Sequence, residues 1–138
     1  MKIFICCSKH FYHQIPCIQE QLKKVGHELT FPNSYEDPFR EEEEKKKGRQ
    51  AHIKWKSEMI RLQNEKVKNS DAVLVLNFEK NGQRNYIGGA TFLEIFKAFE
   101  LGKKIFLFNP IPESIFEDEL IAMNPIVLNK NLSRINNY

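Results

Sequence analysis

A glutamate one turn into a helix-like segment is a leading candidate for chemistry in this chain. The segment 88–101 places Ala90, Glu94 and Ala98 four residues apart, so they share one face of a helix. The opposite, apolar face is predicted to consist of Phe92, Ile95, Phe96 and Phe99. A carboxylate flanked by alanines could be held rigidly beside a ligand. The alternative is a solvent-exposed stripe, because Lys97 follows Glu94 by three residues.

The turn Gly88-Gly89-Ala90-Thr91 before this helix is a candidate site for an anion. Two glycines let a ligand approach the backbone closely, and a helix start offers free N–H groups and a positive dipole end. Ordinary turn chemistry explains such a pair equally well. The chain contains neither G-x-G-x-x-G nor G-x-x-x-x-G-K-[ST], so dinucleotide and Walker fingerprints are absent.

Histidines and cysteines offer weaker candidates. His10, His13 and Cys17 have helix-compatible spacing, but Pro16 marks a helix start inside that span and disrupts a shared face. A nucleophilic pair of Cys7 with His10 or His13 lacks a third group to orient it. We therefore predict neither a metal site nor a cofactor.

Strand-like and helix-like segments alternate along the chain. Strands are predicted at residues 3–7, 27–31, 71–77, 104–109 and 126–128. Helices are predicted at residues 14–26, 41–47, 52–68, 88–101 and 114–123. This order predicts an α/β, flavodoxin-like (Rossmann-type) doubly wound sheet of five parallel strands with helices on both faces. Ligands bind such sheets at the carboxyl ends of the strands, where segments 6–11, 77–89 and 109–112 would meet.

A run of four glutamates and three lysines, residues 41–47, reads as a solvated helical face. Glu41–Lys45, Glu42–Lys46 and Glu43–Lys47 are acid-before-base pairs at four-residue spacing, the stabilising orientation on a helix. We therefore expect these glutamates to stabilise the helix through ion pairs on its solvent-exposed face and to have no role in a binding site.

Size and composition indicate one domain. Of 138 residues, 41% are hydrophobic and 11 are Phe, enough to fill a core over residues 1–128, followed by a polar tail at 129–138. The net charge of +3 is spread along the chain, which argues against a nucleic-acid binder. No stretch approaches the roughly 20 apolar residues of a membrane helix. The N-terminus runs directly into a strand, and an odd count of three cysteines indicates reduced thiols in the cytoplasm.

Five segments, taken in order, resemble one enzyme family. They read K-I-F-I-x-x-S, G-H-E-L-T-F-P, N-S-D-A-V-L-V-L-N, G-G-A-T-F-L-E-I-F-K-A and L-G-K-K-I-F-L-F-N-P. Together they resemble the nucleoside 2-deoxyribosyltransferases and the related deoxynucleoside 5′-monophosphate N-glycosidases. The resemblance runs from residue 2 to about residue 112 and is most specific at 71–110.

The resemblance implies cleavage of an N-glycosidic bond in a nucleoside or nucleotide. Glu94 would attack the anomeric carbon to give a covalent glycosyl-enzyme, which a second base (transferase) or water (hydrolase) resolves. The other implied contacts, with sugar, phosphate or base, are Ser8, Gln63, Asn85, Gly88 and Gly89. The family also implies a homodimer or higher homo-oligomer. Two alternatives stay open: a non-catalytic nucleotide-sensing module, and a protein-interaction scaffold that uses the long helix at 40–69.

Overall fold

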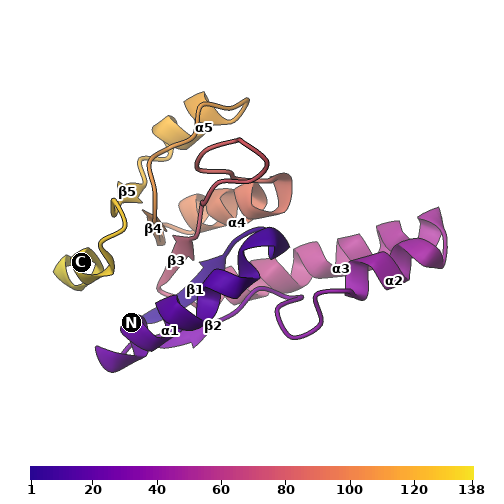
Figure 1. Ribbon diagram of the computed structural model, residues 1–138, viewed down its shortest axis with the longest axis horizontal. Helices are drawn as coiled ribbons and strands as arrows, with labels where there is room; N and C mark the ends of the chain where they lie inside the picture. Colours follow the sequence, from indigo (N-terminus) through magenta and orange to yellow (C-terminus); the bar gives the residue numbers. More distant parts are fainter.

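Five short parallel strands form one sheet in the computed structural model, which describes residues 1–138 (Figure 1). The strand order is β2-β1-β3-β4-β5. The connection after β2 therefore crosses back over β1, and later strands are added on the other side of β1. The strands are β1 Lys2–Cys6, β2 Glu28–Thr30, β3 Ala72–Val75, β4 Lys104–Leu107 and β5 Ile126–Val127. The helices are η1 Lys9–Gln14, α1 Ile15–Lys24, α2 Arg40–Lys46, α3 Arg49–Lys68, α4 Gly89–Glu100, α5 Glu117–Ala122 and η2 Leu132–Asn137, where η denotes a 3₁₀-helix. The predicted flavodoxin-like, doubly wound sheet is confirmed.

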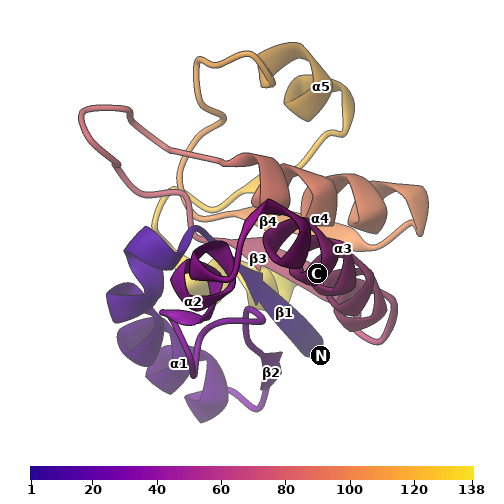
Figure 2. The same ribbon diagram turned by 90° about the vertical axis from the view of Figure 1, so that its right-hand side faces the viewer.

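Each face of the sheet carries its own hydrophobic core. Side chains alternate along β1, so Ile3 and Ile5 enter one core while Phe4 and Cys6 enter the other. Helices α1, η1 and η2 cover the first core, and α3, α4 and α5 cover the second. Figure 2 shows α3 and α4 side by side, away from α1. The strands are buried on both faces, which explains their nearly continuous apolar sequences.

Helix α4 buries only part of the apolar face that its sequence predicted: Ile95 is buried and Phe92 packs against the second core. Its buried residues are Thr91, Glu94, Ile95 and Ala98. Phe96 and Phe99, expected in the core, are 47% and 50% exposed. The helix is apolar on most of its circumference, so periodicity could not identify the inner face. Packing against both the sheet and α3 favours the smaller side chains, and it carries Glu94 inward with them.

The C-terminal segment also differs from the polar tail that was expected. Residues 132–137 form η2, in which Leu132 and Ile135 are buried in the first core. Residues three apart lie on the same side of a 3₁₀-helix, so two apolar side chains suffice to anchor it. The packed unit therefore extends to Ile135, beyond the predicted limit at 128.

The three cysteines are all free thiols. Cys6 and Cys7 are buried and Cys17 is exposed. Cys6 packs in the second core and Cys7 in the first, as expected for neighbours at the end of a strand. None of the helices combines the length and the hydropathy that crossing a bilayer demands.

Candidate functional site

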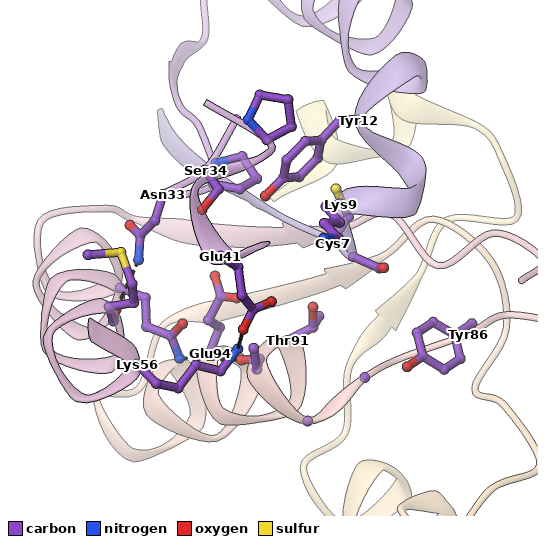
Figure 3. A pocket seen from close by; sticks show the side chains of 18 of the residues that line it. Cys7, Lys9, Tyr12, Asn33, Ser34, Glu41, Lys56, Tyr86, Thr91 and Glu94 are labelled. Carbon is purple, nitrogen blue, oxygen red and sulfur yellow. Dashed lines mark hydrogen bonds and ion pairs between the residues drawn. The ribbon is translucent and has the colours of Figure 1, made fainter. Parts of the chain in front are cut away.

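A cavity of about 310 Å³ opens at the carboxyl end of β1, between the loop after β2, α3 and the start of α4 (Figure 3). This is the edge at which doubly wound sheets bind ligands. Of the segments expected to meet there, 6–11 and 77–89 contribute to the lining, whereas 109–112 does not. Instead, residues from the loop after β2 and from α2 and α3 complete the wall.

Five of the six residues expected at the site line this cavity: Ser8, Gln63, Gly88, Gly89 and Glu94. Asn85 does not line it. Its φ of 56° lies in the left-handed region that asparagine tolerates, so its evident role is in the turn before α4. The adjacent Tyr86 lines the cavity in its place.

Glu94 points from α4 into the cavity and is only 7% exposed (Figure 3). Desolvation raises the pKa of this carboxyl to about 8, although the nearby Cys6 thiol and the charge of Lys66 act in the opposite direction. Burial, followed by the charge of Glu94, raises the pKa of Cys6 well above its usual range, so this thiol stays protonated. Glu94 is therefore mostly neutral at pH 7 and ionises around pH 8.

Lys66 is held near Glu94 by contacts with the sheet. Its Nζ donates to the Phe31 carbonyl at 2.8 Å and lies 5.9 Å from the centre of the Phe4 ring. Burial lowers the pKa of Lys66, and the negative charge of Glu94 opposes that shift. A fixed ammonium group near Glu94 stabilises the carboxylate form once the proton has left.

One end of the cavity is suited to an anion. Gly88 and Gly89 line it, and no side chain caps α4, so N–H groups of the first helical turn are free to bind a ligand. Ser8, Lys9 and Lys80 lie at the same cavity. The Lys80 ammonium also sits 4.6 Å from the centre of the Tyr86 ring, which helps to place it.

Another part of the lining is formed by Glu41 of α2 and Lys56 of α3, which belong to a half-buried group of charged side chains with His52. Oε2 of Glu41 accepts from Lys56 Nζ at 2.9 Å and is paired with His52 Nε2 at 3.0 Å. Desolvation raises the pKa of Glu41, but these two hydrogen bonds outweigh it and lower the pKa to about 2. Figure 3 shows Lys56 and Glu41 pointing toward each other.

Sequence reasoning missed Glu41 as a cavity residue. The lysine four residues later offered a sufficient local partner, yet the structure pairs Glu41 with α3, and Glu42 with Lys9, across different elements. His52 and Lys56 lie one turn apart near the start of α3, so they share one face of the helix. Two basic side chains on one face are the signal in the sequence that could have indicated a carboxylate partner from another element. No group of three or more His, Cys, Asp or Glu side chains could hold a metal ion.

Two solved structures share this fold over the whole chain. One is described as a 2-deoxyribosyltransferase from the psychrotolerant bacterium Bacillus psychrosaccharolyticus, with a TM-score of 0.66, 16% identity, and coverage of 100% of this chain and 92% of that one. The other is a CMP N-glycosidase from Clostridium botulinum, with a TM-score of 0.57, 15% identity and full coverage of both chains. The chain has the 2-deoxyribosyltransferase fold. No protein-family model and no curated protein sequence matches it.

The predicted resemblance is thus confirmed for the fold. Within this 2-deoxyribosyltransferase fold, the cavity brings together a buried carboxyl group, an uncapped helix start and an ionised carboxylate. Tyr12, Trp55 and Met59 add apolar surface to its walls. The combination suits a small ligand that has an anionic or hydroxyl group, an electrophilic centre and a flat polar ring.

Proposed function

We propose that this protein cleaves the N-glycosidic bond of a nucleoside or nucleotide, with Glu94 as the nucleophile. The observation that carries the proposal is Glu94 itself, buried at a cavity in which the first turn of α4 is uncapped. The fold supports the proposal as well, because this chain shares it with one protein described as a 2-deoxyribosyltransferase and with another described as a CMP N-glycosidase. Because all three cysteines are free thiols, we place the protein in the cytoplasm.

The proposed reaction has two displacements at the anomeric carbon. A carboxylate oxygen of Glu94 forms a bond to that carbon while the bond to the base nitrogen breaks, and the departing base keeps the electron pair and takes a proton from water. Water or a second base then attacks the same carbon, the bond from that carbon to the Glu94 oxygen breaks to release the carboxylate, and the proton of the attacking group passes to the hydroxide that the first step left in the solvent. Lys66 stabilises the carboxylate in both its starting and its released form.

The test is incubation with a panel of deoxynucleosides and their 5′-monophosphates, with and without an acceptor base. Free base identifies a hydrolase, and an exchanged nucleoside identifies a transferase. Trp55, the sole tryptophan, lines the cavity, so its fluorescence reports binding independently of turnover. Binding without turnover would identify a non-catalytic sensing module, and no binding of any member would refute the proposal.

The anion-binding end of the cavity leads to a prediction about phosphate. A Cβ added at Gly89 meets no protein atom within 4 Å, so Gly89→Val should fold normally while its side chain crowds the helix start. We expect the dissociation constant of a 5′-monophosphate to rise about tenfold or more, and that of the bare nucleoside to rise much less. Titration of Trp55 fluorescence measures both. Equal effects on the two ligands would mean that this turn does not bind phosphate.

A second copy of this chain is the partner that we propose for the outer face of α4. Leu93, Phe96 and Phe99 are exposed there, on the same helix as Glu94. We expect light scattering to give at least twice 16.3 kDa, and Phe96→Asp with Phe99→Asp to give a monomer. Ile115→Asp is the matched control, because Ile115 is 89% exposed outside this face. A wild-type mass near 16.3 kDa would contradict this assembly.

A further inference from the structure

The wall of the cavity formed by the loop after β2 and by α2 presents two hydrogen-bond acceptors that have no donor. The first is Oδ1 of Asn33, which is buried and has no hydrogen-bond partner. The amide cannot simply turn over, because its Nδ2 donates to the Met59 carbonyl at 2.9 Å. A buried acceptor without a donor is costly, and its partial negative charge makes this part of the wall more favourable to a ligand that carries N–H or O–H groups.

The second acceptor is Oε1 of Glu41. His52 and Lys56 both bind the other oxygen, Oε2, and no protein group donates to Oε1. The two basic side chains hold the group as an ionised carboxylate, so Oε1 accepts hydrogen bonds and cannot donate one. The pairing also fixes which of the two oxygens is left free.

The surroundings of these two acceptors suit a flat ring better than a phosphate. Trp55, 9% exposed, and Met59 supply apolar surface there. The unpaired Oε1 of Glu41 repels the oxygens of an anion at close range, whereas the uncapped start of α4 with Lys80 offers an anion a better site. With the anomeric carbon at Glu94 and a 5′ group at the helix start, the base is the part of a nucleotide left to occupy this wall.

We propose that Glu41 selects the base, and that it selects one that carries an exocyclic amino group. This inference rests on the proposed function. The amino group of cytosine or adenine donates to Oε1 of Glu41. Uracil and hypoxanthine place a carbonyl oxygen at the equivalent position, where its lone pairs would face the Glu41 carboxylate. A site of unpaired polar groups discriminates strongly between two such ligands, because the wrong one leaves those groups unsatisfied.

The binding test compares matched pairs of deoxynucleoside monophosphates, with cytosine against uracil and adenine against hypoxanthine. The readout is Trp55 fluorescence, which needs no turnover. We expect the amino member of at least one pair to bind about tenfold more tightly or better. Equal affinities in both pairs would overturn the inference, even if every compound is hydrolysed. Absence of binding to all four would instead overturn the proposed function.

The variant Glu41→Gln sharpens the test. The carbonyl oxygen of the new amide keeps the place of Oε2, because His52 and Lys56 require an acceptor there, and the amide nitrogen then takes the place of Oε1. The cavity now presents a donor, so the preference should reverse toward the carbonyl-bearing base. The isosteric change leaves the contacts to α3 in place and the fold intact. Glu43→Gln is the matched control, since Glu43 is exposed on the same helix. An unchanged preference in Glu41→Gln would exclude Glu41 as the selecting residue.

Discussion

Glu94→Gln is expected to abolish base release while leaving ligand binding nearly unchanged. Loss of the nucleophile removes the covalent route, and we expect kcat/KM to fall by about 10⁴-fold or more. Binding survives because glutamine has the shape of the neutral carboxyl group that burial already favours at pH 7. Chromatography of the released base measures the first effect, and titration of Trp55 fluorescence measures the second.

The control for this prediction is Glu100→Gln, on the same helix but exposed and paired with Lys97. It should retain the wild-type rate. The pH dependence adds an independent readout: because the attacking form is the carboxylate, wild-type kcat/KM should rise with pH and level off above about 8. Turnover that persists in Glu94→Gln would remove Glu94 from the mechanism, whatever the fate of the fold.

The sequence was sufficient to predict the sheet because its strands are buried on both faces. Runs such as 71–77 consist mainly of β-forming apolar residues. The segment that follows this run has apolar residues at helical spacing and ends at a glycine. The connectivity rules then leave few arrangements, so the edge at which a ligand binds followed as well. Glu94 became a candidate because its place between two alanines is a local property of one helix, and the resemblance to the deoxyribosyltransferases then assigned it the role of nucleophile.

The remainder of the site depends on contacts between elements that are distant in sequence. Glu41 acquires its role from His52 and Lys56, 11 and 15 residues further on, although a local lysine partner was available. The inner face of α4 was partly misassigned because Phe96 and Phe99 are apolar yet face outward. In both cases several local solutions were nearly equivalent, and tertiary packing decided between them.

Burial of Glu94 is also expected to cost stability in a pH-dependent way. Its pKa is about 8 in the folded protein, against a usual value of 4.5 that applies to the unfolded chain. Between these values the folded state retains a proton that the unfolded state has released, so this carboxyl group makes the free energy of unfolding decrease as pH rises through the window. Glutamine does not titrate and carries no such penalty.

Glu94→Gln should therefore match the wild type near pH 4.5 and become progressively more stable than it as pH rises. Above pH 8 the gain approaches a difference of about 5 kcal/mol in the free energy of unfolding. Urea unfolding at pH 5, 7 and 9 measures it, and Glu100→Gln should show a difference from wild type that does not change with pH. A constant difference for Glu94→Gln would mean that the carboxyl group ionises freely in the folded protein. The burial that raises the pKa of Glu94 to about 8 thus makes replacement of Glu94 stabilising above that pH. Such a loss of stability is expected where a residue is retained for activity.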